Sequence, residues 1–252
     1  MKEVIDNFSD QSELYKKFRP VYPKALYDEI MQWVDCRQLC WDCGTGNGQV
    51  AKELAAYFDQ VVATDISESQ IRAAFQKKNI HYKVERAEKT TFERHQFDLV
   101  TVAQAMHWFD QEQFCREVKR VTKNGGIIAI WGYGLIRIDK KVDPFVERFY
   151  REVVGPYWDQ ERRYIDQHYA TIAFDFESIE VSKALSIKDQ WTLATFEGYL
   201  NSWSAVKNFI KANGQNPVPE LIQTIREYWP NDEKKSVEFP LFLRLGRVEN
   251  EK

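Results

Sequence analysis

A glycine-rich heptapeptide is the segment of the chain best suited to binding a small charged ligand. Asp42–Gly48 has the form D-x-G-x-G-x-G. Its glycines permit a tight turn and a close approach of the backbone to a ligand, and a helix that starts directly after them favours a negative group at its N-terminus. The dinucleotide pattern G-x-G-x-x-G requires a glycine where Gln49 stands, so the spacing disfavours a nicotinamide-dependent dehydrogenase.

Two acidic positions further along the chain could bind a ribose and an adenine. Asp65 follows Gly44 by 21 residues and ends an expected strand, where a carboxylate can accept hydrogen bonds from both ribose hydroxyls. The alternative role, a cap on the next helix, is already filled by Ser67. Glu88 could accept a hydrogen bond from an adenine amino group while the Ala87 N–H meets a ring nitrogen, or it could be an ordinary solvated surface glutamate.

The segment after the fourth expected strand supplies candidates for the acceptor side of a reaction. Gln104 ends that strand and His107 follows it closely. His107 is therefore the best candidate for a catalytic base or an acceptor-binding group, the alternative being that it orients the loop or packs beside Trp108. Trp108, Tyr133 and Trp203 are weaker candidates for the acceptor pocket, because aromatic side chains more often belong to the core.

The expected elements explain why these residues should meet. Strands and helices alternate along the first half of the chain, which predicts a mostly parallel sheet with helices on both faces. Such sheets bind ligands beyond the carboxyl ends of their strands. Asp110 begins a helix whose end is marked by Lys123–Gly126. The expected strands are Gln38–Cys43, Val61–Asp65, Ile80–Val84, Phe97–Gln104 and Ile127–Trp131.

The two ends of the chain have a different pattern. A helix at Ser12–Phe18 is expected to stop before Pro20, and a second helix begins at Pro23. Residues from about 139 to 230 look mostly helical and rich in aromatic side chains, with room for a strand near Ser178–Ala184, and Val237–Val248 returns to the sheet. We expect one domain over residues 1–252, with a core at 1–134 and 236–252 and a helical, aromatic-rich cap at 135–235.

The composition limits the kinds of partner that the protein is expected to bind. The net charge of −3 gives no general attraction to nucleic acid or to an anionic membrane, and no apolar run approaches the ~18 residues of a membrane span. The four cysteines are expected to be reduced thiols in a cytoplasmic protein. Cys36, Cys40 and Cys43 match an iron–sulfur spacing, but Cys40 and Cys43 should point to opposite faces of a strand. With no zinc-like quartet either, no metal is expected.

The sequence resembles the class I S-adenosylmethionine-dependent methyltransferases, and within them the small-molecule group that includes the trans-aconitate methyltransferases. The resemblance covers most of the chain. It is carried by Tyr15–Pro23, Asp42–Gly48, Ala63–Ser67 and Ala103–Phe109, and much less specifically by Gly198–Ser204. It implies a Rossmann-like fold, with a mostly parallel seven-stranded sheet flanked by helices and a mostly helical cap inserted late in the chain.

The same resemblance implies a cofactor site for S-adenosylmethionine. Within the first motif, Asp42 and Thr45 would belong to this site. Tyr15 and Arg19 would close over the cofactor. Gly44, Gly46 and Gln104 would hold its amino-acid end, Asp65 its ribose, and Ile66, Ala87 and Glu88 its adenine.

The expected function is transfer of a methyl group to a small-molecule acceptor by in-line displacement. The methyl donor is already activated, so the protein mainly aligns the reacting atoms. A carboxylate is one candidate acceptor, and it is ionised at neutral pH and needs no base, whereas a phenol, amine or carbon acid can need one. A second function stays open, that of an S-adenosylmethionine-binding sensor without turnover.

Overall fold

The computed structural model describes residue 18 and residues 20–249 of the 252-residue chain. Two residues expected to close over the cofactor, Tyr15 and Arg19, lie outside the described residues, as does the expected helix at 12–18 apart from Phe18. Within the described part of the chain, no helix is long and apolar enough to cross a membrane.

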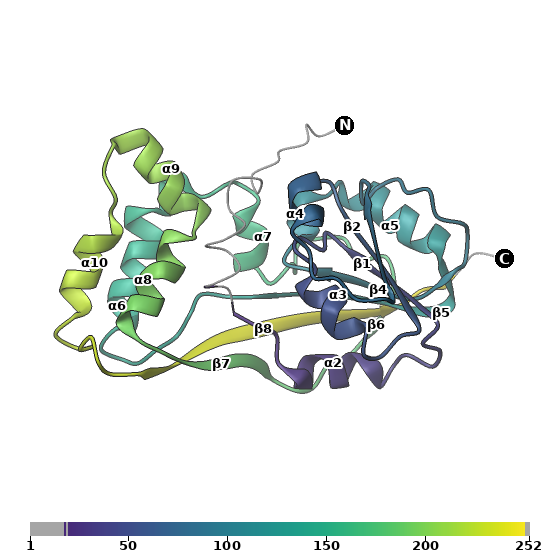
Figure 1. The fold of residues 1–252 in the computed structure, drawn as a ribbon, viewed down its shortest axis with the longest axis horizontal. Helices are drawn as coiled ribbons and strands as arrows, with labels where there is room; N and C mark the ends of the chain where they lie inside the picture. Colours follow the sequence, from purple (N-terminus) through teal and green to yellow (C-terminus); the bar gives the residue numbers. More distant parts are fainter. Residues whose placement is uncertain (1–17, 19, 250–252) are drawn as a thin grey trace.

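A single mixed sheet organises the molecule (Figure 1). Five parallel strands, in the order β3-β2-β1-β4-β5, are extended by the antiparallel β8 and then β6, while β7 pairs with the other half of β8. The strands are β1 (Leu39–Cys43), β2 (Gln60–Asp65), β3 (Ile80–Val84), β4 (Phe97–Ala103), β5 (Thr122–Tyr133), β6 (Glu177–Ile179), β7 (Leu185–Trp191) and β8 (Lys235–Arg247). The expected α/β Rossmann-like fold is confirmed.

Helices surround the parallel strands and also form a separate group at one end of the molecule. In Figure 1, α6, α8, α9 and α10 gather at the left, and the long strand β8 runs from them into the sheet. The helices are α2 (Lys24–Met31), α3 (Gln49–Leu54), α4 (Glu68–Arg72), α5 (Gln111–Val121), α6 (Asp143–Arg148), α7 (Arg162–Asp166), α8 (Leu193–Asn201), α9 (Ser204–Asn213) and α10 (Val218–Ile225), with short turns η2 (Met106–Trp108), η3 (Phe149–Val153) and η4 (Gly155–Tyr157).

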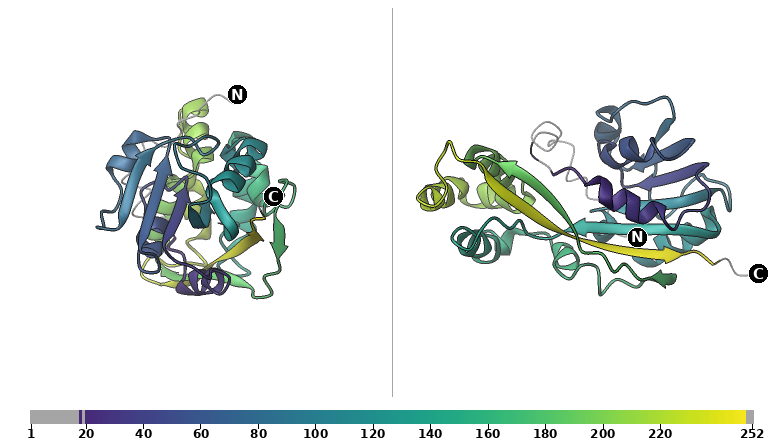
Figure 2. Two further views of the ribbon diagram at one scale, coloured as in Figure 1. Left: turned by 90° about the vertical axis from the view of Figure 1, so that its right-hand side faces the viewer. Right: turned by 90° about the horizontal axis from the view of Figure 1, so that it is seen from below.

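The sheet separates two apolar clusters. Alternate residues of β1 point to opposite faces, so Cys40 belongs to the cluster that contains α2, and Cys43 to the cluster that contains α5. The strand-face argument about these two cysteines is thereby confirmed. Figure 2 shows the helices on the two sides of the twisted sheet.

The sheet has eight strands, one more than expected, and one of the expected strands has different bounds. β8 is long enough to pair with β5 through residues 241–247 and with β7 through residues 235–241, so it supports an additional strand. The strand expected near Ser178–Ala184 is present in part: β6 covers its first two residues and ends at Ile179, and β7 begins only at Leu185. The alternation of β7 is weak because only Leu185, Ile187 and Trp191 are buried within it.

The glycines at 125 and 126 do not end a helix, contrary to expectation. α5 ends at Val121 and β5 begins at Thr122. The register between β4 and β5 shifts between Phe97 and Leu99, and Gly125 has φ +79°. A bulged strand start needs a left-handed residue just as a helix end does, so the sequence signal is the same for both.

Part of the segment assigned to the cap packs on the sheet. Ile165, Tyr169 and Ile172 belong to the same apolar cluster as the β4 residues Val100 and Val102. β6, further along, pairs with β8 in the main sheet. The domain boundaries at 135 and 235 stay a prediction.

A buried carboxylate ties the first strand to its neighbours. Asp98 at the start of β4 is 4% exposed, and its Oδ2 accepts hydrogen bonds from the backbone N–H groups of Gln38 and Leu39, each at 2.9 Å. Its Oδ1 lies 2.6 Å from the Lys123 Nζ. The pair fixes where β1 enters the sheet, and therefore where the glycine-rich turn after it emerges.

Replacing Asp98 with Asn should lower the free energy of unfolding by about 2 kcal/mol, since it leaves Lys123 facing an amide and weakens two backbone hydrogen bonds. Asp175→Asn is the matched control, because Asp175 also lies 2.5 Å from a lysine, Lys119, but its side chain is 81% exposed; its effect should stay under about 0.5 kcal/mol. Urea unfolding measures both. Equal effects of the two variants would contradict this account.

Candidate cofactor and acceptor site

A cavity opens at the carboxyl ends of the parallel strands. It is reached by the turns after β1, β2 and β4 and by the segment after β3. The cofactor residues expected from the sequence that line it are Asp42, Gly44, Thr45, Gly46, Asp65, Ile66, Ala87, Glu88 and Gln104. Residues from four separate turns therefore meet at one place, as the βα alternation requires.

The glycine-rich turn after β1 combines a close contact with an open space. Gly44 has φ +68°, and a Cβ there would lie 2.7 Å from the Ala105 Cβ, so a side chain would clash. Gly46 has φ +55°, but a Cβ there would meet only the Gln70 Oε1, at 4.0 Å. Gly44 is thus needed to pack the turn against the loop after β4, whereas the backbone at Gly46 is the part that a ligand can approach.

Asp65 joins this turn to the helix that follows β2. Its Oδ2 accepts a hydrogen bond from the Gly46 N–H at 2.8 Å, and its Oδ1 accepts one from the Ser67 N–H at 2.9 Å. The hydroxyl of Ser67 caps α4 by accepting from the Gln70 N–H. Asp65 therefore ties the glycine-rich turn to the start of α4 at the rim of the cavity.

Asp42 lies beneath the turn and is used by the chain's own hydroxyls. It is 1% exposed, and it accepts hydrogen bonds from the Thr45 Oγ1 at 2.5 Å and the Thr101 Oγ1 at 2.8 Å. Burial raises the pKa of Asp42 to about 6, even though these hydrogen bonds act to lower it. Asp42 therefore supports the turn from below while also bordering the cavity.

The segment after β3 forms the opposite wall. Ile66 is 41% exposed beside Asp65 and offers an apolar surface. Glu88 is not a solvated surface residue, because its side chain is 11% exposed, its Oε1 accepts from the Asp110 N–H at 3.0 Å, and its Oε2 lies 3.4 Å from the Arg86 Nε. Glu88 thereby connects the wall of the cavity to the start of α5.

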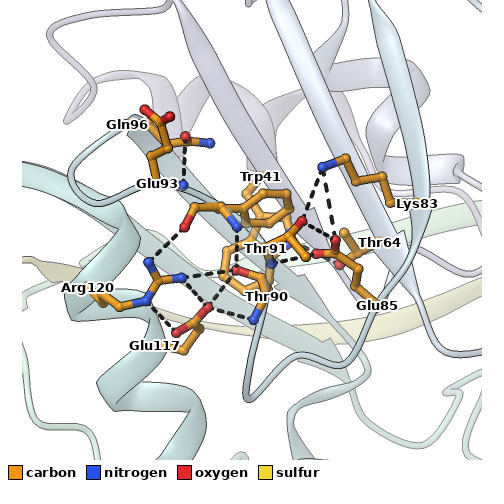
Figure 3. A network of polar contacts seen from close by, with 11 residues as sticks. Trp41, Thr64, Lys83, Glu85, Thr90, Thr91, Glu93, Gln96, Glu117 and Arg120 are labelled. Atoms are coloured by element: carbon orange, nitrogen blue, oxygen red, sulfur yellow. Dashed lines mark hydrogen bonds and ion pairs between the residues drawn. The ribbon is translucent and has the colours of Figure 1, made fainter.

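A polar network holds the loop that continues from this wall (Figure 3). Glu117 of α5 accepts hydrogen bonds from the Thr90 N–H at 2.7 Å and from Arg120 Nη2 at 2.7 Å, while Arg120 Nη1 donates to the Phe92 carbonyl at 2.7 Å. Burial would raise the pKa of Glu117, but the hydrogen bonds from Arg120 and Thr90 outweigh it and lower that pKa. The network fixes residues 90–92 on α5.

Gln104 has a strained backbone and a tethered side chain. Its φ is +54°, which is uncommon for a residue other than glycine. Its Oε1 accepts from the Tyr133 N–H at 3.2 Å, and a Cβ on Gly132 would lie 2.2 Å from that oxygen. Because the carbonyl end of the amide faces β5, the Nε2 end is the donor that can serve a ligand carboxylate. Strain of this kind often marks a functional site.

His107 and Trp108 occupy different environments. His107 is 5% exposed, and its Nδ1 lies 2.8 Å from the Tyr169 hydroxyl. Its ring centroid is 4.7 Å from that of Trp108. Trp108 lines the cavity, but His107 is not among the lining residues. This corresponds to the alternative in which the histidine packs beside Trp108.

The other two aromatic candidates also lie in different environments. Tyr133 lines the cavity and contacts the rings of Tyr22 and Phe239. Trp203 is 3% exposed and does not line it. Trp203 instead packs among the rings of Phe149, Tyr150, Trp158 and Tyr199.

Sequence reasoning missed several residues that border the cavity. Gln49 and Ser67 could have been found, because Gln49 directly follows the first motif and Ser67 is the last residue of the second. Glu161 could not, because it comes from a segment near 160 whose position depends on the packing of α7 against η2. Within residues 18 and 20–249, no three His, Cys, Asp or Glu side chains are arranged to hold a metal ion.

Comparisons with known proteins agree on one family. A family profile described as a methyltransferase domain matches residues 41–130. A Dictyostelium discoideum protein named as a methyltransferase is 36% identical over 97% of this chain and 95% of its own length. A solved structure described as a type II methyltransferase from Anaeromyxobacter dehalogenans is 36% identical, with a TM-score of 0.86 over 93% of this chain and all of that one. A Saccharomyces cerevisiae protein, named as an S-adenosylmethionine-dependent methyltransferase, is 24% identical and aligns over 84% of each chain.

The raised pKa of Asp42 predicts that its carboxyl group lowers the stability of the fold as the pH rises. Because the folded-state pKa is about 6 and the ordinary value is 3.8, the folded protein binds the proton more tightly, so this group destabilises the fold progressively as pH rises through that window. Asp42→Asn has no such dependence. The stability of the wild type relative to Asp42→Asn should fall by about 1.5 kcal/mol between pH 5 and 7.5, measured by urea unfolding of both proteins. A difference that does not change with pH would show that Asp42 titrates normally.

Proposed function

The chain belongs to the class I S-adenosylmethionine-dependent methyltransferases, and we propose that it transfers the methyl group of that cofactor to a small-molecule carboxylate. The observation that carries the proposal is the convergence of Gly46, Asp65 and Gln104 on one cavity whose remaining wall includes Trp108 and Tyr133. Polar groups on one side and aromatic rings on the other suit a charged cofactor beside an acceptor with an apolar body.

We assign the cofactor contacts along the rim of the cavity. The backbone at Gly44 and Gly46 and the side-chain amide of Gln104 would hold the amino-acid end, and Asp65 would hold the ribose. The open space at Gly46 and the tethered amide of Gln104 support this placement. The adenine would lie between Ile66 and the segment at Ala87 and Glu88. Tyr15 and Arg19 keep their proposed closing role by resemblance alone.

Asp42 and Thr45 act through the turn in this proposal. Their mutual hydrogen bond and the bond from the Thr45 N–H to the Thr64 carbonyl, at 2.9 Å, keep the turn after β1 in shape. A turn held in advance lowers the entropy cost of binding.

S-adenosylmethionine, when bound, supplies a methyl group on a sulfonium: the acceptor oxygen forms a bond to the methyl carbon as the carbon–sulfur bond breaks, which gives a methyl ester and S-adenosylhomocysteine. A carboxylate is ionised at neutral pH and has no proton to lose. The residues of the chain therefore need only align the acceptor and exclude water. His107 then keeps Trp108 in place, and it would serve as a base only for an acceptor that carries a proton.

The proposed subgroup, class of acceptor and location in the cell rest mainly on the sequence. We place the chain beside the trans-aconitate methyltransferases on the four motifs quoted above, and we propose a small-molecule acceptor rather than nucleic acid because the net charge is −3. We propose the cytoplasm as its location because Cys36, Cys40, Cys43 and Cys115 are all free thiols.

Asp65→Ala should weaken S-adenosylmethionine binding at least about tenfold, because charge-assisted hydrogen bonds to two ribose hydroxyls and the tether to Gly46 are lost together. Glu68→Ala is the matched control: Glu68 lies three residues further on, is exposed and forms a surface ion pair with Arg72. Calorimetric titration, with NAD as a parallel ligand, measures the effect. Unchanged binding by Asp65→Ala, or preference for NAD, would contradict the proposed cofactor site.

His107→Asn should lower kcat by less than about tenfold with a carboxylate acceptor, because no proton is transferred and only the support of Trp108 is weakened. The measurement is the initial rate of S-adenosylhomocysteine formation at saturating substrates between pH 6 and 8. A loss of about 10²-fold or more, with a rate that follows the titration of a histidine in the wild type, would make His107 a catalytic base.

The sensor function is separated from the enzyme by turnover. Steady conversion of S-adenosylmethionine to S-adenosylhomocysteine, beyond one equivalent per protein, requires an acceptor site. Tight cofactor binding with no conversion by any acceptor would favour the sensor.

A further inference from the structure

A buried arginine lies among aromatic rings next to the cavity. Arg162, the first residue of α7, has its guanidinium carbon 5.5 Å from the centroid of the Tyr150 ring and 4.7 Å from that of Trp158. Its Nε donates a hydrogen bond to the Tyr150 hydroxyl at 2.9 Å. The Tyr150 hydroxyl in turn donates to Asp166 at 2.6 Å. These contacts hold the guanidinium group in one orientation.

The outer end of this guanidinium group is not used by the fold. The nearest carboxylate, Asp166, is 3.8 Å from the Nε and is itself half-exposed. Among the hydrogen bonds of the described residues, Arg162 uses only its Nε. The side chain keeps 18% of its surface exposed, so the two Nη groups, with four N–H donors, remain available to a partner. A planar fork of this kind matches the two oxygens of a carboxylate.

The position of Arg162 connects it to the acceptor side of the cavity. Its neighbour Glu161 lines the cavity. α7 packs against η2, which carries His107 and Trp108, and Figure 1 shows α7 between the outer helices and the sheet.

Aromatic rings in contact with one another connect the wall of the cavity with the rings around Arg162. Trp203 contacts both Trp158 and Tyr199. Tyr199 contacts Phe239, which contacts the cavity residue Tyr133. A continuous series of packed aromatic rings therefore connects the wall of the cavity with the surroundings of the guanidinium group.

We propose that Arg162 is the residue that recognises the acceptor, by donating hydrogen bonds from its Nη groups to the acceptor's carboxylate, with the apolar body of the acceptor against Trp158. The inference rests on the proposed function and names the residue that gives it specificity. A carboxylate oxygen has two lone pairs, so one that accepts from Arg162 retains another for the methyl carbon. Fixing that oxygen in line supplies the alignment on which the reaction depends.

A purely structural role makes a different prediction. If Arg162 only joins Tyr150, Trp158 and Asp166, its replacement lowers stability and leaves the choice of acceptor unchanged. Recognition instead requires that its replacement reduce the preference for acids over their neutral amides. The two roles are therefore separated by specificity.

The experiment compares Arg162→Gln and Arg162→Lys with the wild type, with Arg163→Gln as matched control. Arg163 is adjacent, but it is exposed and is turned to the partly buried ring of Tyr164. The probes are benzoate and hexanoate against benzamide and hexanamide. Their binding to the protein loaded with S-adenosylhomocysteine is measured by calorimetry, and methyl transfer by S-adenosylhomocysteine formation. Thermal unfolding and affinity for S-adenosylhomocysteine report on the integrity of each variant.

The wild type and Arg163→Gln should bind an acid at least about tenfold more tightly than its amide, because a charged donor meets a charged acceptor. Arg162→Gln should abolish this preference and Arg162→Lys, which keeps the charge without the fork, should retain part of it. Affinity for S-adenosylhomocysteine should change less than about twofold in all variants.

Three results would overturn the inference: no acid binds the loaded wild type, acid and amide bind equally, or Arg162→Gln keeps the preference. If Arg162→Gln does not fold, a folded Arg162→Lys decides the matter: a reduced or lost preference for the acid supports recognition by the guanidinium group, and full retention of the preference overturns it. Failure of the wild type to bind S-adenosylmethionine would instead remove the proposed function. Cofactor binding with turnover of neutral acceptors only would remove the carboxylate as acceptor and the role of Arg162, and would leave the methyltransferase activity itself.

Discussion

The carboxylate of Asp65 is the interaction on which the geometry of the cavity depends. It accepts hydrogen bonds from the turn after β1 and from the start of α4, and so connects two neighbouring βα units at the edge of the cavity. The turn itself rests on Asp42, whose charge is buried. A site that binds a ribose through Asp65 therefore uses the same group that holds the site together, which explains why its loss should affect binding far more than a surface charge would.

β8 provides a second constraint. One end of this strand pairs with β5 in the sheet, while the other pairs with β7 beside the outer helices. A rigid strand that belongs to both parts leaves little freedom between them. The rings of Tyr133, Phe239 and Tyr199 lie along this junction, so the proposed acceptor side lies where the two parts meet.

The parallel half of the fold was predictable because each element carries its own local signal. β3 begins and ends at the expected residues, and β1, β2 and β4 differ by one residue at one end, since each is a short apolar run bounded by glycines, caps or turns. The residues that follow those strands reach the cavity for the same topological reason. The signal failed at Gly125, where a bulge and a helix end require the same backbone conformation, and at β7, where burial on one face is interrupted by Lys188, Asp189 and Gln190.

The acceptor side was less predictable because it depends on contacts between distant segments. Nothing local distinguishes Arg162 from Arg163, yet one is enclosed by rings and the other is exposed. His107 was expected to face the reaction from its position in the chain, but Tyr169, 62 residues away, holds its ring. Only packing assigns such partners.

The strained backbone positions also depend on contacts between distant segments. Among the described residues, the non-glycine positions with positive φ are His95, Gln104, His168 and Tyr169, and two of these touch the site directly or through His107. Each costs of order 1 kcal/mol or more unless the surroundings determine it. At Gln104 the surroundings are Gly132 and the Tyr133 N–H; at Tyr169 they are the His107 ring and Arg244, which donates to the Tyr169 carbonyl. The strained residues are thus held by contacts within the fold itself, and a site built on them would align the reacting groups through the fold, as the proposed methyl transfer requires.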